Sequence, residues 1–113
     1  MNEKGSYFRQ ERIGIQFRVL SKTNDVITLS AHKNGRSKRN ESKLRLADHC
    51  ARFPDWNKIE FHEKEVTSVG FMMDSDINDV ITKSAKRNAH SKRNEAKLRL
   101  ADHCAQFPSW QPS

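Results

Sequence analysis

Two stretches of the chain alternate between apolar and polar residues. The first runs from Ile13 to Val19 and the second from Ser68 to Met73. A period of two is typical of a β-strand with one buried face. We therefore expect two strands whose inner faces are apolar. The inward positions are Ile13, Ile15, Phe17 and Val19 in the first strand and Val69, Phe71 and Met73 in the second.

A helical spacing of apolar residues follows each strand. The pattern predicts a short helix that ends at Asn34-Gly35 in one stretch and at Asn88-Ala89 in the other, where the backbone can turn left-handed. The candidate N-caps are Ser21 or Thr23, and Asp74 or Ser75; the inward face consists of Val26, Ile27 and Ala31, and of Val80, Ile81 and Ala85.

A second helix should open at Ser37 and, in the other stretch, at Ser91. Each serine is followed four residues later by a glutamate, one position beyond the ideal capping-box spacing. A residue before a proline resists the helical conformation. These helices should therefore end at the Phe-Pro pairs Phe53-Pro54 and Phe107-Pro108.

The pattern is an internal repeat. Residues 24–56 and 78–110 are offset by 54 positions and are identical at 25 of 33. Two copies are too few for a solenoid, so we expect two halves packed face to face about a pseudo-twofold axis, with their strands paired antiparallel. The expected parts are an N-terminal tail at 1–12, repeats at 13–54 and 66–108 joined by a linker at 55–65, and a C-terminal tail at 109–113, with both repeats in one structural domain.

Composition narrows the function. Only 35% of the 113 residues are hydrophobic, which argues against an enzyme with a deep substrate cavity. A formal net charge of +7 and a pI near 9.7 favour a polyanion as partner, most commonly nucleic acid. The first 56 residues carry 12 basic and 6 acidic side chains and the rest carry 9 and 8, so the first half should bind a polyanion more strongly.

Neither a membrane span nor a signal peptide is visible, since the chain has no run of 18 apolar residues and its first ten residues lack an apolar core. We expect a soluble cytoplasmic protein with its two cysteines reduced. The role of the tail at 1–11, which contains Lys4, Tyr7 and Arg9, is left open between disorder and contact with phosphates.

The order of strand, helix, Asn34-Gly35-Arg36-Ser37 turn and helix resembles the ribbon-helix-helix superfamily of the Arc and MetJ repressors. The resemblance implies a mainly α fold with a two-stranded antiparallel β-ribbon, in which two β-α-α repeats form an intramolecular pseudo-dimer. It also implies a partly buried structural ion network, although Ala89 and His90 replace the glycine and first arginine of the turn in the second repeat. The network would comprise Arg36, Glu41 and Arg45, with Glu95 and Arg99 in the second repeat.

Each repeat also carries an Arg-Leu-Ala-Asp-His segment before its Phe-Pro end, at 45–49 and at 99–103. A single chain with two such units is similar to the TraY family of relaxosome accessory proteins from F-like conjugative plasmids. That resemblance implies sequence-specific binding of double-stranded DNA at a transfer origin, DNA bending that helps the relaxase nick, and regulation of the transfer promoter. The implied partners are the DNA, the relaxase and other relaxosome proteins, and the implied state is a monomer of which several copies can bind side by side.

A two-stranded ribbon fits the major groove of B-DNA, so its outer face is the candidate for reading bases. Gln16 can pair with adenine and Arg18 with guanine through two hydrogen bonds each. The second strand offers a hydroxyl at Ser68, backbone at Gly70 and an apolar contact for a thymine methyl at Met72. Two other interpretations stay open. The polar positions of both strands are only solvent-exposed, or the sequence of the second strand has diverged so that it contacts no base.

The start of the second helix in each repeat is a candidate phosphate site. Free amides and the helix dipole attract anions there, and adjacent cations strengthen the attraction. Such contacts would position the protein on DNA without reading sequence. The residues concerned are Ser37, Lys38 and Arg39 in the first repeat and Ser91, Lys92 and Arg93 in the second.

The remaining chemistry points to structure rather than to catalysis. The pairs His49-Cys50 and His103-Cys104 suggest zinc, but adjacent residues on a helix point about 100° apart, so we expect core cysteines, surface histidines and no metal or cofactor. Trp56 and Trp110 should cap the edge of the core. No nucleophile with a base and an orienting group is visible. The alternatives to a relaxosome protein are a transcriptional repressor with no role in conjugation, and an adaptor that binds an acidic protein.

Overall fold

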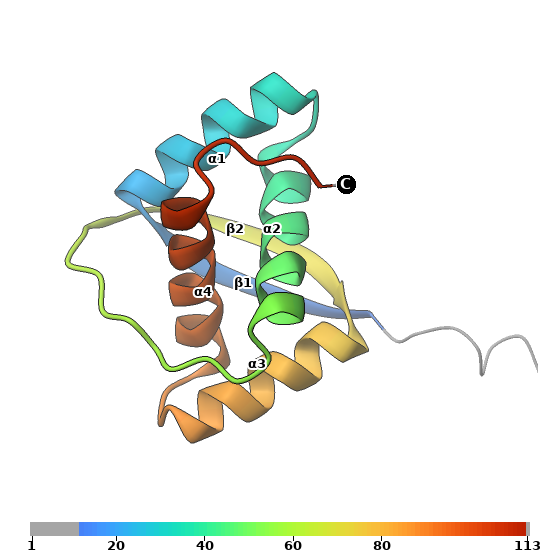
Figure 1. Ribbon diagram of the computed structural model, residues 1–113, viewed down its shortest axis with the longest axis vertical. Coiled ribbons are helices and arrows are strands. Elements are labelled where there is room, and N and C mark those ends of the chain that lie inside the picture. The colour runs from blue at the N-terminus through green and yellow to red at the C-terminus, as the bar shows by residue number, and fades with distance from the viewer. Residues whose placement is uncertain (1–11, 113) are drawn as a thin grey trace, which may run out of the picture.

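The chain forms the order strand, helix, helix twice over (Figure 1). A computed structural model describes residues 12–112, so the alternatives for the tail at 1–11 lie outside the described residues. The expectation of a mainly helical fold with one two-stranded antiparallel sheet is confirmed. The elements are β1 (Arg12–Leu20), α1 (Ser21–Asn34), α2 (Lys38–Arg52), β2 (Glu65–Asp74), α3 (Ser75–Arg87) and α4 (Lys92–Gln106).

The two strands pair with Gln16 opposite Gly70. The alternation predicted from sequence directs Phe17 and Phe71 into the core, where their rings meet edge to face with centroids 6.0 Å apart. A bulge interrupts the register between Val19 and Leu20, near the start of β2. One face of the ribbon is therefore apolar and covered, and the other is exposed.

The helices cover only one face of the ribbon. Figure 1 shows α2 and α4 side by side in front of the two strands, with α1 and α3 at opposite ends. Ile27, Leu46, Ile81 and Leu100 fill the space between helices and strands and are at most 1% exposed. The cysteines are also in this core, as expected, and burial raises the pKa of Cys50 to about 11 and that of Cys104 to about 12. Both thiols are therefore protonated at neutral pH.

The predicted starts of α2 and α4 and the predicted end of α1 are confirmed. Ser37 and Ser91 cap α2 and α4, and each hydroxyl accepts a hydrogen bond from the backbone N–H three residues later at 3.0 Å. Gly35 ends α1 with a φ of 67°. In the second half Ala89 adopts a φ of 59°, although a Cβ atom disfavours this left-handed conformation.

The predicted cap of α1 is wrong. Leu20 takes the N-cap position, Ser21 is the first helical residue and Thr23 is buried. The first turn is instead capped from the linker: Glu63 Oε1 accepts a hydrogen bond from the Lys22 N–H at 2.9 Å. Sequence patterns detect caps within a few residues, and this one comes from 41 positions away.

At the start of α3 the outcome differs again. Asp74 takes the N-cap position with extended backbone, as one of the two candidates predicted, but its side chain makes no capping hydrogen bond. Ser75 is the first residue of the helix.

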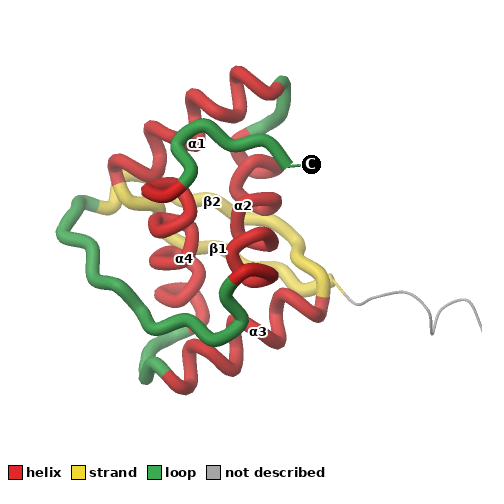
Figure 2. Tube along the Cα trace, viewed as in Figure 1, coloured by secondary structure: helices red, strands yellow, loops and turns green. Residues whose placement is uncertain are grey.

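The segments that follow α2 and α4 cross to the opposite half. Figure 2 shows the linker as a long loop between the end of α2 and the start of β2. The Trp56 carbonyl accepts a hydrogen bond from Asn88 at 3.0 Å, and the Trp110 carbonyl accepts one from Asn34 at 3.2 Å. Both indoles are less than a tenth exposed, so each tryptophan closes the edge of the core, as expected.

No helix within residues 12–112 has the length and apolar character needed to cross a membrane.

Candidate nucleic-acid interface

The exposed face of the ribbon contains three consecutive cross-strand pairs, and the exposed pair of Arg12 and Asp74 lies beyond them. The register places Gly14 opposite Met72, Gln16 opposite Gly70 and Arg18 opposite Ser68. Directly opposed residues of an antiparallel pair lie about 5 Å apart, so the six positions form one continuous strip. All five residues predicted to read bases lie on this strip.

The two ends of the strip differ chemically. At one end Arg18 donates a hydrogen bond to the Ser68 hydroxyl at 3.4 Å, and its Nε lies 3.8 Å from a carboxylate oxygen of Glu65. At the other end Met72 is 47% exposed beside Gly14, where an added Cβ would lie 3.4 Å from the Met72 sulfur. The strip is polar and charged at the Arg18 end and apolar at the Met72 end, beyond which Arg12 and Asp74 add charge.

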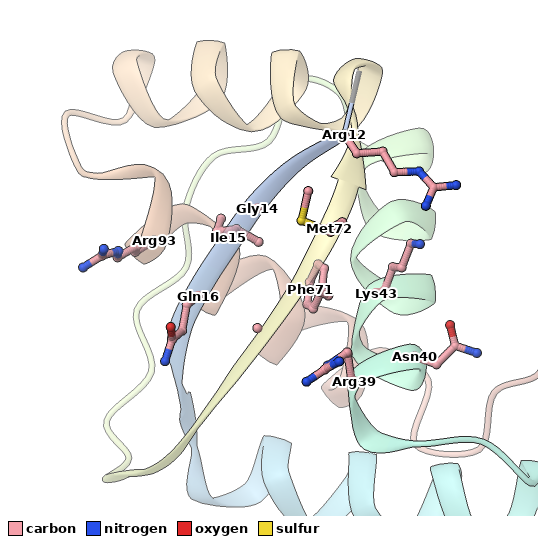
Figure 3. Close-up of a pocket in the computed structure, with 11 residues that line it drawn as sticks. Arg12, Gly14, Ile15, Gln16, Arg39, Asn40, Lys43, Phe71, Met72 and Arg93 are labelled. Atoms are coloured by element: carbon pink, nitrogen blue, oxygen red, sulfur yellow. The ribbon is translucent and has the colours of Figure 1, made fainter. Parts of the chain in front are cut away.

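Cationic side chains flank the strip on both sides. Figure 3 shows Arg39, Asn40 and Lys43 of α2 on one side of the strands and Arg93 of α4 on the other. These residues, Arg12 and the Gly14, Gln16, Gly70 and Met72 positions of the strip line a shallow groove of about 680 Å³. A second groove, of about 630 Å³, continues past Arg18. It is bounded by Asn94 and Lys97 of α4.

The helix-start residues separate into two groups. Arg39 and Arg93 line the groove over the ribbon, as the sequence suggested for a phosphate site. Lys38 instead donates a hydrogen bond to Asn24 in the first turn of α1 at 2.6 Å, and Lys92 donates one to Asn78 in the first turn of α3. Each lysine therefore ties the start of one helix to the start of another.

The residues proposed as an ion network meet in the first half, where Glu41 and Arg45 are buried and Arg36 is partly buried. Glu41 is inaccessible to solvent and accepts hydrogen bonds from Ser30 at 2.6 Å, Arg36 at 2.7 Å and Arg45 at 2.9 Å. Burial alone would raise the pKa of Glu41, but these three donors outweigh it and hold the pKa below its usual value. The carboxylate therefore stays charged in the core.

The second half builds the same centre with different side chains. Glu95 accepts hydrogen bonds from Ser84 at 2.5 Å and from Arg99 at 2.8 Å, and His90 lies 2.5 Å from it in the place of Arg36. Asn88 adds a further hydrogen bond at 3.2 Å. Burial opposes ionisation here too, but the donors lower the pKa of Glu95. The second turn has Ala89 and His90 in place of glycine and arginine, and the Glu95 carboxylate is still hydrogen-bonded.

Each buried arginine reaches across to a histidine of the other half. Arg45 Nη1 lies 3.1 Å from His103 Nδ1 and also donates a hydrogen bond to the Phe107 carbonyl at 2.8 Å. Arg99 makes the same two contacts with His49 and the Phe53 carbonyl. The arginines therefore join the two repeats through the centre of the molecule.

The expectation of surface histidines is wrong. His49 and His103 are fully buried, because each ring lies between an arginine and an aspartate of the other repeat. A guanidinium can only donate, so Nδ1 of each ring accepts and Nε2 donates, to Asp102 and Asp48 respectively, at 2.8 Å. Both rings are therefore neutral.

The pKa shifts of the histidines follow from this geometry. Burial and the positive charge of Arg45 lower the pKa of His103 to about 4, although Asp48 favours the charged ring. Burial and Arg99 likewise lower the pKa of His49. Protein groups occupy both nitrogen atoms of each ring, and residues 12–112 contain no cluster of three or more candidate metal ligands.

Comparison with known proteins places the chain in a family. The family model described as the TraY domain matches residues 15–63 and 69–113, which is most of the sequence. The chain belongs to the TraY family. The relaxosome protein TraY of Escherichia coli (strain K12) is 28% identical to it over 86 residues, which cover 74% of this chain. They cover 66% of that relative, so the match spans just under two thirds of its length. No solved structure matches the chain.

This TraY-family protein has groove residues that sequence reasoning missed. Lys43 follows Arg39 by four positions, and Lys97 follows Arg93 by the same interval. Side chains at this interval share one face of a helix, so each pair extends along the groove. The repeat of the spacing in both halves was the available signal. The residues missed are Arg12, Asn40, Lys43, Glu65, Asn94 and Lys97.

Proposed function

We propose that the protein binds double-stranded DNA by placing the exposed face of its β-ribbon in the major groove. The observation that carries this proposal is the strip of exposed side chains between Arg39 and Arg93, which are supplied by the starts of two different helices. The major groove admits a two-stranded ribbon, and phosphate backbones border it on both sides. Side chains that can contact bases lie in the middle of this face and cations lie at its edges, which matches the arrangement of the major groove.

Base contacts then follow from the strip. Gln16, at its centre, pairs with adenine, and Arg18, at the polar end, pairs with guanine. Met72, at the apolar end, contacts a thymine methyl group, with Ser68 and Gly70 completing the face of β2. Because the two ends differ, the preferred DNA site is not a palindrome.

Phosphate contacts come from the starts of α2 and α4. Unpaired backbone amides at these ends attract anions, and Arg39 and Arg93 add charge where the groove edge passes. Ser37, Lys38, Ser91 and Lys92 contact phosphates at the same two ends. The serines also cap the helices, and the lysines also bond Asn24 and Asn78. These contacts position the protein and supply most of the binding that is independent of sequence.

The whole chain acts as one binding unit. In this proposal the two β-α-α repeats, 13–54 and 66–108, form an intramolecular ribbon-helix-helix pseudo-dimer, supported by the antiparallel pairing of β1 with β2 and by the arginines that cross between halves. Sedimentation of the free protein should give the mass of one chain. An obligate dimer with exchanged strands would contradict the proposal.

The biological role proposed is that of a relaxosome accessory protein at the transfer origin of a conjugative plasmid. Family membership and the name of the Escherichia coli relative support it. In this role the protein bends the DNA, helps the relaxase to nick, contacts other relaxosome proteins and regulates the transfer promoter. It is a binding protein rather than an enzyme.

A footprint on the DNA that flanks its own gene tests the role. Protection at the transfer origin supports the relaxosome role. Protection confined to a promoter supports a transcriptional repressor with no part in conjugation, which would use the same ribbon. Binding to an acidic protein that persists in excess duplex DNA would instead favour an adaptor.

Salt-dependent binding tests the proposed face directly. Arg39→Ala and Arg93→Ala should each weaken binding to every duplex, and each should reduce the slope of log K against log salt by about 0.9 for one lost phosphate contact. Lys58→Ala is the control, since it removes the same charge from the linker, outside both grooves. Equal effects of all three variants would show that only net charge matters.

A further inference from the structure

Glu65, the first residue of β2, is an acidic residue among the cationic side chains of the second groove. Its Oε2 accepts a hydrogen bond from Lys97 of α4 at 2.9 Å, and its Oε1 lies 3.8 Å from Arg18 Nε. A carboxylate at this place repels the phosphates of any DNA that approaches the groove. Glu65 therefore weakens non-specific binding of DNA, which indicates a role other than affinity.

The local backbone directs Glu65 to this place. Thr67 pairs with Val19 and Glu65 with Leu20, so Val66 is the extra residue of the bulge. A bulge breaks the alternation of a strand and redirects side chains, often beside a functional site. Both Glu65 and Val66 are exposed as a result. The carboxylate thus lies on the same side of the ribbon as Arg18.

Two groups contact the arginine, and a third anchors one of them. Arg18 lies beside Glu65, which Lys97 anchors to α4, and it donates to Ser68 on the opposite strand. The ion pair of Arg18 with Glu65 is exposed, at 52% and 41% for the two side chains, so it adds little stability. Its consequence is orientation: it limits the directions in which a long, flexible side chain can point before DNA binds.

We propose that Glu65 is a positioning residue for DNA specificity, which orients Arg18 toward one base and suppresses phosphate binding at the same end of the ribbon. The inference rests on the proposed DNA-binding function. An arginine that is oriented in advance loses less freedom on pairing with guanine, and it is less available to a phosphate. Glu65 therefore lowers affinity for DNA in general and raises selectivity at the base pairs next to Arg18.

The test compares wild type, Glu65→Gln and Glu60→Gln. Glu60 is an exposed linker residue, so its variant removes the same charge outside the grooves. Each protein is titrated with an unrelated duplex, with the best duplex that wild type selects from a random library, and with versions of that duplex changed one base pair at a time. Glutamine keeps the shape of the side chain, so folding is preserved.

Glu65→Gln should bind the unrelated duplex roughly threefold more tightly, as expected for removing a unit charge about 7 Å from a phosphate in water. It should also lose roughly three- to tenfold of discrimination, only at the base pairs where Arg18→Ala relaxes preference. In the Arg18→Ala background, Glu65→Gln should still raise affinity but change discrimination nowhere. Glu60→Gln should behave as wild type.

Two results would overturn the inference. One is a gain in affinity by Glu65→Gln with discrimination unchanged at every base pair, which is a pure charge effect. The other is a loss of discrimination that persists in the Arg18→Ala background. If Arg18→Ala leaves the preference at every base pair unchanged, both the proposed base readout and this inference are wrong. If Arg18→Ala behaves as expected and Glu65→Gln does not, only the inference fails.

Discussion

Acid should destabilise the fold through its buried histidines. His103 has a pKa near 4 in the folded protein, against 6.5 as its ordinary value. Below pH 6.5 the His103 ring is protonated in the unfolded chain but stays neutral in the folded chain. Stability therefore falls as pH falls from 6.5 toward 4 and is constant above that range. The buried ring donates one N–H to Asp48 and accepts from Arg45, so a second ring proton would face a guanidinium.

The size of the effect follows from the shift. One pKa unit corresponds to about 1.36 kcal/mol, so His103 alone should cost about 2 kcal/mol at pH 5 relative to pH 8. For a chain of this length that corresponds to a fall in Tm of about 8 °C. His49, whose pKa is also lowered, adds to the fall. Glu41 and Glu95 have lowered pKa values too, and their contribution is lost only at lower pH.

Urea unfolding between pH 5 and pH 8, followed by tryptophan fluorescence, measures this dependence. In His103→Gln the amide oxygen can accept from Arg45 and the amide nitrogen can donate to Asp48, with no proton to gain. This variant should show a smaller difference in unfolding free energy between pH 8 and pH 5. His32→Gln, an exposed control, should keep the wild-type difference. If His103→Gln keeps the full wild-type difference, the His103 ring is not a source of the pH dependence.

The remaining predictions concern the backbone and the linker. Ala89→Gly should raise the free energy of unfolding by about 1 kcal/mol because it relieves a left-handed alanine. Gly35→Ala should lower the free energy of unfolding by a similar amount. Urea titrations in which both substitutions change stability in the same direction would contradict this. Glu63→Ala should lower Tm by about 4 °C through loss of the α1 cap, while Glu60→Ala should leave it unchanged.

Local signals in the sequence predict most of the fold. The period of two along 13–19 gives β1, and Ser37, Gly35 and Phe53-Pro54 give helix ends, because each depends on neighbours within a few residues. The repeat adds the antiparallel pairing of the strands, since two similar halves favour a twofold arrangement. The positions on the outer face of the ribbon follow from the same alternation.

Features that join distant residues could not be predicted in this way. Glu63 caps a helix from 41 positions away, and His103 is buried because Arg45, 58 positions away, supplies a donor for it. A polar residue in a helical pattern predicts a solvent-exposed side chain unless its buried partner is known. The same limit concealed Glu65, whose exposure on the ribbon depends on a bulge that no residue of the strand signals.

The central claim is that the exposed face of the ribbon reads an asymmetric DNA site. Selection of duplexes from a random library by the wild-type protein, in parallel with Arg18→Ala, tests it most directly. We expect a non-palindromic consensus for wild type. For the variant we expect relaxed preference at one or two base pairs on one side only, worth about 1 to 3 kcal/mol at each bidentate contact. A strictly palindromic consensus, or relaxation on both sides, would contradict it.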